Sequence, residues 1–558
     1  MTFLKNLKHT IVITLYQFFN FLKRRLQIKF CSCTILLVQN NIGEDAIVAF
    51  LDVIQQTIPY QADTTSLFAR LCENKPNTLL LDSAEIGSKN SLKSLLIAQT
   101  AVKVVCRKQT VEFIALTENG TDVLAQLQQH FSINTTLQTQ HSTHQLSVIF
   151  PLLNNELDED SKLKTITIFD GLRTLLQQYQ PYSQPILLGG LFAYDLVANF
   201  IPMQDIYLED DGLTSPDYSF YLAEQLIVID HQSEQATLYT YAFSEQHRTK
   251  LQQQAEQIVS ALSNNNIVLS RRNASTEVKV NIEDEAFKTI IERLKHHINI
   301  GDVFQIVPSR RFSLDCPSPL AAYHQLKHNN PSPYMFFMQD EEFTLFGASP
   351  ESALKYTEAT RQLEIYPIAG SRPRGFDAQG NIDPELDARL ELEMRLDHKE
   401  QSEHLMLVDL ARNDIARVCE SGTRRVAELM QVDRYSHIMH LVSRVVGKLK
   451  PELDALHAYQ ACMNMGTLTG APKIKAMQLI YQVEKQRRHS YGGAVGYLSS
   501  EGDLDTCIVI RSAFVQNGTA YIQAGCGEVL DSDPQMEADE TRHKAAAVIK
   551  AIKQTNCQ

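Results

Sequence analysis

The alternation of apolar and polar positions divides the chain into two parts with different patterns. Between about residue 46 and residue 275, short β-type runs such as 78–81 and 111–115 alternate with segments of helical periodicity, which indicates a mixed α/β or α+β arrangement. The polar, Gln- and Asn-rich stretch at 243–275 predicts a surface helix that runs into a linker. We therefore predict a boundary near residue 275, with one domain at 46–275 and a second at 276–558.

The second part opens with an amphipathic helix. Phe287, Ile291 and Leu294 share one stripe at helical spacing, and Gly301 stands where the helix would end. More elements follow: strands are predicted at 303–307, 343–347, 363–368, 494–499, 507–515 and 520–524, and helical stretches at 386–418 and 535–553. Because most of these strands would be joined by hairpins, we expect an α+β fold rather than a Rossmann-type parallel sheet.

The first 45 residues differ from the rest of the chain. They are basic and apolar, and their apolar run at 11–22 is shorter than the roughly 20 residues that a membrane-spanning helix needs. No small-residue cleavage site follows this run. Three interpretations stay open: a dispensable extension outside the fold, an amphipathic membrane-touching anchor, and a cleaved signal. We expect no membrane interaction of the main body.

Composition and charge narrow the class of protein. The chain has 558 residues, of which 44% are hydrophobic and 21% charged, so it is long and apolar enough for a large globular core. Its net charge of −13 argues against nucleic acid as a partner. The ten cysteines show no Cys-x-x-Cys spacing, which disfavours a disulfide framework or a zinc ribbon and favours a reducing cytoplasm. P-loop and dinucleotide-binding motifs are absent from the sequence.

Two pairs of carboxylates are the first candidates for chemistry. Glu400 and Glu403 are three residues apart on one predicted helix, and Glu537 and Glu540 repeat this spacing on another, so each pair shares a helix face. If the two faces converge, the like charges require a cation, and all-oxygen ligands suit Mg²⁺ or Mn²⁺ better than zinc. The alternative is two solvated charged faces.

Two glycine-containing turns follow predicted strands and are candidates for anion binding. Gly370 and Ser371 lie in the first turn, and Gly525, Cys526 and Gly527 form the second. Glycine allows a close approach of the backbone, whose N–H groups can then face an anion. With Arg511 and Lys544, the set could bind a dicarboxylate held against a metal ion. The alternative is two ordinary turns.

Five ordered motifs carry a resemblance to a known family. They are Gly-Asp-Val-Phe-Gln-Ile-Val-Pro-Ser-Arg at 301–310, Gly-Ala-Ser-Pro-Glu at 347–351, Tyr-Pro-Ile-Ala-Gly-Ser-Arg-Pro-Arg at 366–374, Asp-His-Lys-Glu-Gln-Ser-Glu-His-Leu-Met-Leu-Val-Asp at 397–409 and Tyr-Gly-Gly-Ala-Val-Gly-Tyr at 491–497. Over roughly residues 60–555 the chain resembles the chorismate-utilising enzymes, and within them most closely the large subunits of anthranilate synthases.

The resemblance implies both a fold and a reaction. The fold is α+β, with two packed β-sheets flanked by helices in the catalytic domain and an intimately associated N-terminal regulatory α+β domain. The reaction converts chorismate and ammonia into anthranilate and pyruvate, the first step of tryptophan biosynthesis.

The resemblance also implies roles for the candidate residues. Glu403 and Glu540 would be the Mg²⁺ ligands, with Glu400 and Glu537 supporting them from outside. The metal would hold the ring carboxylate of chorismate. The other carboxylate contacts would come from a larger set: Tyr491 and Arg511 on the enolpyruvyl group, with help from Gly370, Ser371, Gly525, Cys526, Gly527 and Lys544.

The catalytic residues follow from the same resemblance. Glu351 would be the general acid that protonates the departing 4-hydroxyl group, so we predict a raised pKa for it. His440 would serve the second step, the loss of pyruvate. Gln305 stands where water-adding relatives carry a lysine base, and Ala369 where aminodeoxychorismate synthases carry a nucleophilic lysine, so free ammonia should attack directly. A catalytically silent tryptophan-binding subunit is the alternative from another class.

Partners and regulation are implied as well. The sequence shows no glutaminase nucleophile in a Gly-x-Cys-x-Gly turn, so ammonia should come from a separate glutaminase subunit, component II, in a complex that is often a heterotetramer. L-tryptophan should be a feedback inhibitor. Residues matching the inhibitor site come from both parts of the chain: Asp82, Ser83, Lys93, Pro333, Tyr334 and Met335. Three positions depart from the common residue: Asp82 replaces Glu, Ser371 replaces Thr and Cys526 replaces Ala.

Overall fold

The structure is a computed structural model, and it describes most of the chain after the N-terminal segment. The extension predicted at 1–45 lies outside the described residues. Those residues are 49–73, 75–83, 93–154, 156–201, 208–262, 269–435 and 438–557.

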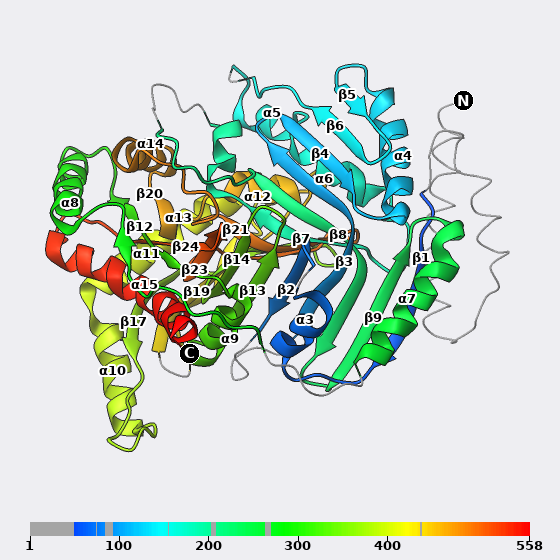
Figure 1. Ribbon diagram of the computed structural model, residues 1–558. Coiled ribbons are helices and arrows are strands. Elements are labelled where there is room, and N and C mark those ends of the chain that lie inside the picture. Colours follow the sequence, from blue (N-terminus) through cyan, green and yellow to red (C-terminus); the bar gives the residue numbers. More distant parts are fainter. Residues whose placement is uncertain are drawn as a thin grey trace. The chain divides into compact units, whose positions relative to one another are not determined.

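Antiparallel strands form two large layers that share β3 (Lys93–Arg107) and β8 (Tyr218–Asp230) (Figure 1). Layer one runs in the order β1 (Asp52–Ile58), β9 (Gln235–Ala242), the second half of β8, the first half of β3, β2 (Thr78–Asp82), β13 (Tyr334–Gln339), β14 (Thr344–Ser349), β23 (Ser512–Gln516), β24 (Thr519–Gly525), β12 (Ser309–Asp315) and β10 (Lys279–Val280).

Layer two contains the other halves of the two shared strands. Its order is β5 (Gln138–His141), β6 (Gln145–Ile149), β4 (Thr110–Ala115), the second half of β3, the first half of β8, β7 (Leu187–Phe192), β21 (Ala494–Ser499), β22 (Leu504–Ile508), β15 (Ser352–Thr357), β16 (Gln362–Ile365) and β19 (Ile438–Lys448). Along β19, β17 (Ile368–Pro373) extends the edge that β16 occupies, and β18 (Arg425–Arg434) covers the other edge. A short pair, β11 (Gln305–Ile306) with β20 (Gly470–Ala471), stands apart.

The chain passes from one layer to the other within continuous stretches of sequence. The β3–β8 pairing shifts register between Ile97 and Val102, where β3 leaves layer one. The chain also passes from one layer to the other between β14 and β15, around Glu351, and between β22 and β23, around Arg511. The prediction of one strand at 507–515 is therefore wrong, because Arg511 adopts a positive φ of 49° that ends β22 and redirects the chain into layer one.

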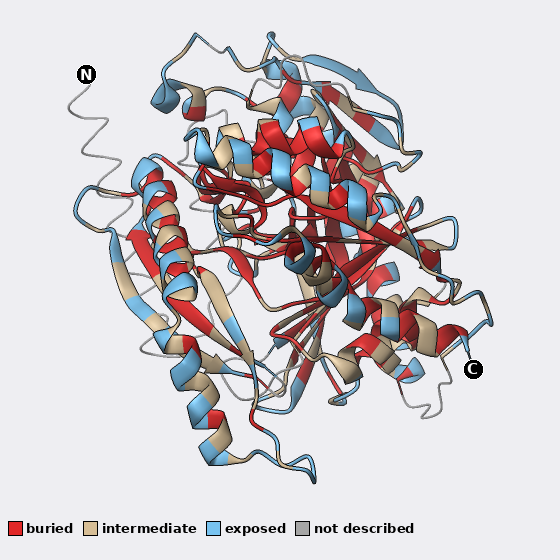
Figure 2. Ribbon diagram, turned by 90° about the vertical axis from the view of Figure 1, so that its left-hand side faces the viewer, coloured by how far each residue is buried: buried red, intermediate tan, exposed pale blue. Residues whose placement is uncertain are grey.

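Alternating side chains show that the two layers pack face to face. In β2, Leu79 joins the core between the layers, whereas Leu80 joins the core on the outer face of layer one. β13 repeats this alternation with Phe336 and Phe337. Figure 2 shows the resulting distribution, with buried strands at the centre and helices whose outer faces are exposed. The predicted fold of two packed sheets flanked by helices is confirmed.

Helices cover the outer faces of both layers. On layer one lie α3 (Thr64–Cys72), α7 (Arg248–Ala261), α9 (Pro319–Asn329) and α15 (Pro534–Asn556). On layer two lie α4 (Glu118–Ile133), α6 (Phe169–Gln177), α11 (His398–Val418) and α12 (Ala455–Cys462). The remaining helical elements are α5 (Glu159–Lys164), η1 (Tyr194–Asn199), η2 (Glu245–His247), α8 (Asp284–Asn299), α10 (Pro384–Leu396), α13 (Gly466–Thr469) and α14 (Lys473–Glu484).

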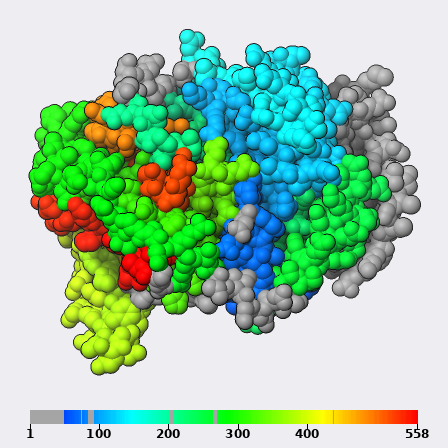
Figure 3. All heavy atoms as spheres, in the orientation of Figure 1, coloured from blue at the N-terminus to red at the C-terminus, as the bar shows by residue number. Residues whose placement is uncertain are grey.

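The predicted helical stretch at 386–418 consists of two helices. Asp397 has an extended backbone, and its carboxylate accepts hydrogen bonds from the N–H groups of Lys399 and Glu400, so it caps α11 and separates it from α10. In the space-filling view, α10 (yellow-green) projects from the surface (Figure 3). The helix predicted around Phe287 is confirmed as α8, which ends before Gly301. None of the helices in the described ranges is long and apolar enough to cross a membrane.

Strands from the two sides of the predicted boundary near residue 275 pair with each other. β2 pairs with β13, and β7 pairs with β21. Each layer therefore contains strands from both predicted domains, and the division at residue 275 stays a prediction.

The buried guanidinium of Arg488 joins several of these elements. It forms an ion pair with Glu484 and donates hydrogen bonds to the carbonyl groups of Val307 and Leu468. It also lies over the ring of Tyr194, 4.8 Å from the centroid. Arg488 therefore connects α14, α13 and the segment between β11 and β12 with η1 from the first half of the chain.

We expect the substitution Arg488→Met to lower the free energy of unfolding by about 3 to 5 kcal/mol, because it leaves the Glu484 carboxylate buried without its cation. Urea denaturation followed by circular dichroism measures this change. Arg412→Met is the matched control, since its ion pair with Asp409 is exposed and should contribute less than about 1 kcal/mol. Equal effects of the two substitutions would contradict the role assigned to Arg488.

Candidate functional site

The two places where strands change layers lie against each other and bring Glu351 and Arg511 together. The N–H of Ala348 donates to the carbonyl of Arg511 at 3.1 Å, and the N–H of Ile508 donates to the carbonyl of Glu351 at 3.0 Å. Both side chains are thereby placed where the layers separate, and each influences the pKa of the other.

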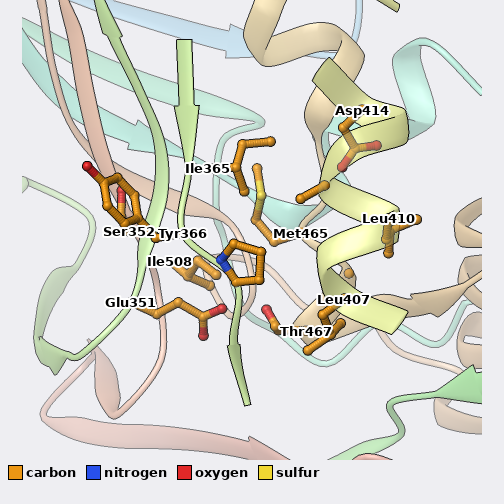
Figure 4. A pocket seen from close by; sticks show the side chains of 13 residues that line it. Glu351, Ser352, Ile365, Tyr366, Leu407, Leu410, Asp414, Met465, Thr467 and Ile508 are labelled. Atoms are coloured by element: carbon orange, nitrogen blue, oxygen red, sulfur yellow. The ribbon is translucent and has the colours of Figure 1, made fainter. Parts of the chain in front are cut away.

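Burial keeps a substantial fraction of the Glu351 carboxyl groups protonated near neutral pH. The residue is 8% exposed, and desolvation raises its pKa to about 7, although Arg511 and Lys544 act in the opposite direction. In Figure 4 the carboxyl group turns toward Thr467. The two residues line a cavity of about 30 Å³, room for roughly one water molecule, whose apolar wall includes Leu407 and Met465. The predicted raised pKa of Glu351 is confirmed.

Carboxylates from two helices on opposite layers converge beside this position. Glu403 comes from α11, and Glu537 and Glu540 come from α15. Desolvation and the neighbouring carboxylates raise the pKa of Glu403 to about 7, and burial and Glu540 raise the pKa of Glu537. Glu400 is engaged elsewhere, because Arg372 donates to it at 2.8 Å.

The charges in this cluster are only partly compensated. Lys544 pairs with Glu540 at 2.5 Å, and Lys399 lies 3.8 Å from Glu403. One buried carboxylate oxygen of Glu403 and one of Glu537 have no hydrogen-bond partner among the described residues. Buried carboxylates without donors fit a cation, so the residues present are suited to a divalent metal ion.

Gly370 and Ser371 lie inside β17, where the pairing with β19 shifts register between Ile368 and Ser371. The prediction of a turn there is therefore wrong, because the chain forms a bulge within the strand. This β17 bulge lies beside the carboxylates. Gly370 has a φ of 94°, and a Cβ atom there would lie 3.2 Å from an oxygen of Glu400 and 3.0 Å from Leu441. The preceding carbonyl, from Ala369, lies 3.0 Å from Nδ1 of the buried His404. The backbone before Ser371 is therefore held close to α11 by a glycine in the left-handed region.

The second turn closes the opposite side. A Cβ atom on Gly525 would lie 2.6 Å from the carbonyl of Pro308 and 2.9 Å from the hydroxyl of Tyr491, so a larger residue would displace that tyrosine. Lys544 donates to the carbonyl of Gly525 at 3.0 Å. Cys526 is buried and follows in the same turn.

Gln305 and His440 complete the group. Gln305 is 5% exposed, its side-chain oxygen has no partner in the described part of the chain, and its nitrogen would lie 2.9 Å from a Cβ on Gly527. His440 in β19 stands opposite Ser371 in β17. Burial and the nearby Arg511 lower the pKa of His440 to about 4, so its imidazole is neutral at pH 7. The geometry therefore places a protonated acid, a neutral histidine and an arginine around one position.

The residues predicted for inhibitor binding gather at a different place in layer one. Asp82 at the end of β2 stands opposite Met335 in β13, which follows Pro333 and Tyr334, and β3 begins at Lys93. Ser83 follows Asp82 directly. The carboxylate of Asp82 accepts hydrogen bonds from Thr64, Ser94 and Lys327, so its charge is compensated within the protein.

Two contributors to the site were not identified from the sequence. His404 joins the backbone at Ala369 to the hydroxyl of Ser443, which lies 2.6 Å from its Nε2. Glu528, after the second turn, is fully buried, and both of its carboxylate oxygens lack a partner among the described residues. His404 lies in the 397–409 motif, where the helical spacing indicates a role only for the glutamates. Glu528 follows a Gly-Cys-Gly sequence without any periodic signal.

Comparison with known proteins identifies the family of this chain. The model of the chorismate binding enzyme family matches residues 121–550, most of the chain. The chain belongs to the chorismate-binding enzyme family. The predicted resemblance to chorismate-utilising enzymes is thereby confirmed.

Several members of the chorismate-binding enzyme family are highly similar to this chain. Anthranilate synthase component 1 of Haemophilus influenzae is 69% identical over 510 residues, which are 91% of this chain and 98% of that protein. The protein of the same name from Escherichia coli strain K12 is 53% identical over 502 residues, 88% of this chain and 95% of that protein.

Solved structures of chorismate-binding enzymes share the fold. Anthranilate synthase component I from Streptococcus pneumoniae TIGR4 aligns with a TM-score of 0.63 and 28% identity, covering 83% of this chain and 93% of that one. The menaquinone-specific isochorismate synthase of Escherichia coli aligns with the same TM-score at 18% identity, covering 93% of this chain and 98% of that one.

We expect the contribution of Glu403 to the free energy of unfolding of the metal-free protein to fall as the pH rises from about 4.5 to about 7. A carboxyl group whose pKa is raised by folding binds more protons in the folded state, so its contribution is full at low pH and is lost as the pH passes the folded pKa. Glu403 has this property. Thermal unfolding across this pH range, with and without Mg²⁺, measures the effect, and Mg²⁺ should stabilise the protein more at pH 8 than at pH 5.

The variant Glu403→Gln separates this effect from general titration. It should raise the metal-free stability at pH 8 by on the order of 1 kcal/mol and reduce the response to Mg²⁺. Glu501→Gln, which changes an exposed carboxylate, is the control and should leave both unchanged. A response to Mg²⁺ that is the same in Glu403→Gln and in the unsubstituted chain would remove Glu403 from the metal site.

Proposed function

We propose that this protein converts chorismate into anthranilate, as the large component of an anthranilate synthase. The observation that carries the proposal is the protonated Glu351 beside Arg511 and a cluster of uncompensated carboxylates, in a chain 69% identical to a protein named anthranilate synthase component 1. A general acid, an anion-binding arginine and a metal-binding cluster are the three requirements of the reaction.

Substrate binding uses the β17 bulge, the turn after β24, and the side chains of Arg511, Tyr491 and Lys544. The Arg511 guanidinium and the Tyr491 hydroxyl hold the enolpyruvyl carboxylate, because a planar guanidinium can meet a carboxylate with two parallel hydrogen bonds. The N–H groups of the β17 bulge at Gly370–Ser371 and of the turn at Gly525–Gly527, together with Lys544, complete the contacts to the carboxylates. Tyr491 is buried against the Arg488 side chain, which lies 5.6 Å from its ring centroid and keeps it in place.

The reaction needs an acid and a neutral imidazole. As ammonia adds at C2 of chorismate, Glu351 donates a proton to the departing 4-hydroxyl group, which a carboxyl group with a pKa of about 7 can do near neutral pH. His440 is neutral and serves the second step, in which pyruvate is lost and the ring becomes aromatic. His440 stands opposite Ser371, next to the β17 bulge.

Mg²⁺ is the metal that we assign to the carboxylates. Glu403 and Glu540 hold it, and Glu400 and Glu537 support them. When bound, Mg²⁺ neutralises the ring carboxylate of chorismate and orients the ring. The unpartnered oxygens of Glu403 and Glu537 support this assignment, because protein carboxylates are the ligands that Mg²⁺ takes.

The nucleophile is ammonia rather than water or a lysine side chain. Gln305 is buried at the site, and its amide cannot deprotonate a water molecule. Ala369 has no group that could attack C2 in place of ammonia. Both positions favour anthranilate over the products of sibling reactions.

A separate glutaminase subunit supplies the ammonia. Burial raises the pKa of the Cys72, Cys316 and Cys419 thiols to about 12, so these cysteines are not activated nucleophiles. We expect a component II glutaminase as the partner, in a heterotetramer of two copies of each chain. The free thiols are also consistent with a location in the reducing cytoplasm.

The purified chain should form anthranilate from chorismate, ammonium and Mg²⁺, as measured by the fluorescence of the product. Glu351→Gln keeps the size of the side chain but cannot donate a proton, so kcat/KM should fall by about 10² to 10⁴-fold. In Glu403→Gln, kcat/KM should fall by a similar factor, because the metal is lost.

The exposed Glu452 provides the control, since Glu452→Gln should retain full activity. Full activity of Glu351→Gln would contradict its role as the acid. Chorismate consumption without anthranilate would contradict the proposed reaction and favour a sibling one.

Feedback inhibition by L-tryptophan is the second part of the proposal. The inhibitor residues lie in register with the catalytic ones, since Met335 stands opposite Asp82 on one side and opposite Ala348 on the other. Ala348 donates to the Arg511 carbonyl. A ligand that moves β2 against β13 would therefore act on the place where Glu351 and Arg511 meet.

We expect Ser83→Phe to raise the tryptophan concentration for half-inhibition at least about tenfold, a loss of about 1.4 kcal/mol of binding, because the larger side chain takes the place of a hydroxyl group proposed to contact the inhibitor. Initial rates of anthranilate formation at increasing tryptophan measure it, and the uninhibited rate should be unchanged. Ser233→Phe, in the turn between β8 and β9, should behave like the unsubstituted chain. Unchanged inhibition of Ser83→Phe would place the inhibitor elsewhere.

A further inference from the structure

Glu528 is a buried carboxyl group that the proposed reaction does not use. The residue is 0% exposed, and both of its carboxylate oxygens lack a hydrogen-bond partner among the described residues. Its backbone is fixed, because its N–H donates to the carbonyl of Ile306 at 2.8 Å and its carbonyl accepts from the N–H of Ile306 at 3.1 Å. The side chain therefore cannot reach water without breaking both bonds.

Two further ligand atoms lie beside this carboxylate. One atom each of Cys526, Glu528 and Glu537 lie within 4.8 Å of one another, and all three residues are buried. Glu537 is 4% exposed and also has one oxygen without a partner in the described ranges. Unpartnered oxygens thus come from two separate elements, the turn after β24 and helix α15.

The cations near Glu528 do not bind its oxygens. Lys295 is close enough to lower the pKa of Glu528, but its ammonium group donates to the carbonyl of Ser532 at 2.7 Å. Lys399, which also acts on Glu528, lies 3.8 Å from Glu403 instead. A buried carboxylate without donors is unfavourable unless it takes up a proton or a metal ion.

We propose that Cys526, Glu528 and Glu537 form a second metal site, which binds a thiophilic divalent cation of the Zn²⁺ or Co²⁺ type. The thiol distinguishes it from the Glu403 and Glu540 site, because sulfur ligands select zinc-like metals whereas Mg²⁺ takes oxygen ligands. Bond lengths of about 2.0 to 2.3 Å to oxygen and sulfur require ligand atoms roughly 3.3 to 3.8 Å apart in a tetrahedron. The three atoms lie within 4.8 Å of one another, so they must move closer together to bind the ion, and a fourth ligand would have to enter with it.

Occupation of this site would tie the second turn to α15. Glu537 lies one helical turn before Glu540, and Cys526 lies between Gly525 and Gly527. A metal held there would therefore fix the backbone that faces the substrate carboxylates. The two sites share Glu537, which supports the Mg²⁺ ligands, but Cys526 and Glu528 are not Mg²⁺ ligands, and metal binding to them can be measured without the proposed reaction.

The test uses Co²⁺ as a spectroscopic probe of the full-length chain. Metal-free protein with Cys31, Cys33 and Cys557 replaced by serine is titrated with Co²⁺, so that thiols outside the cluster do not contribute. We expect one Co²⁺ per chain to give a thiolate-to-metal charge-transfer absorption in the near ultraviolet, whereas Co²⁺ bound by the Glu403 and Glu540 carboxylates gives none. Equimolar Zn²⁺ should remove this absorption, whereas a hundredfold excess of Mg²⁺ should leave it.

Variants in the same background assign the absorption to the cluster. Cys526→Ala should abolish it, and Glu528→Gln should weaken Co²⁺ binding at least tenfold. Cys316→Ala, which changes a buried cysteine at the end of β12, is the matched control and should leave the absorption unchanged. Circular dichroism and thermal unfolding verify that each variant is folded.

Two results would overturn the proposal. One is the absence of the thiolate absorption in the folded protein, which would mean that Glu528 is simply protonated. The other is an absorption that persists in folded Cys526→Ala or at full affinity in folded Glu528→Gln. Because the readout is metal binding, either result is distinguishable from a failure of anthranilate formation.

Discussion

The mutual hydrogen bonding of two chain segments that change layers is the constraint on which the rest of the structure depends. Ala348 to Arg511 and Ile508 to Glu351 are the backbone contacts that join them. Since each segment leaves one sheet and enters the other, the side chains at the crossing can belong to neither hydrophobic face. An acid and a guanidinium occupy these positions, and burial there decides that the acid is protonated near pH 7.

The helices outside the two layers supply a cluster of carboxylates. α11 covers layer two and α15 covers layer one, so their N-terminal turns approach each other only because the layers are joined at the crossing. Carboxylates that would be solvated on either helix alone are brought together, and they raise one another's pKa. The same fold thus keeps one carboxyl group neutral for proton transfer and gathers others that require a cation.

Pairing between strands from distant parts of the sequence connects the first half of the chain to this arrangement. β13 lies between β2 and β14, so Met335 is in register with both Asp82 and Ala348. Arg488 adds a second connection through its ion pair with Glu484 and its contact with Tyr194. The two halves are therefore coupled through backbone pairing and a buried charge rather than through a flexible linker.

Periodicity and local residue order are sufficient for the α+β class, several strands, the carboxylate pairs and the motifs of the family, and these could be predicted from the sequence. It did not reveal the break at Asp397, the division of the strand at Arg511 or the burial of Glu528. Those depend on a cap, on a change of sheet and on distant neighbours, which local pattern does not contain. Only the tertiary structure decided which carboxyl groups are uncharged, because burial and nearby charges set each pKa.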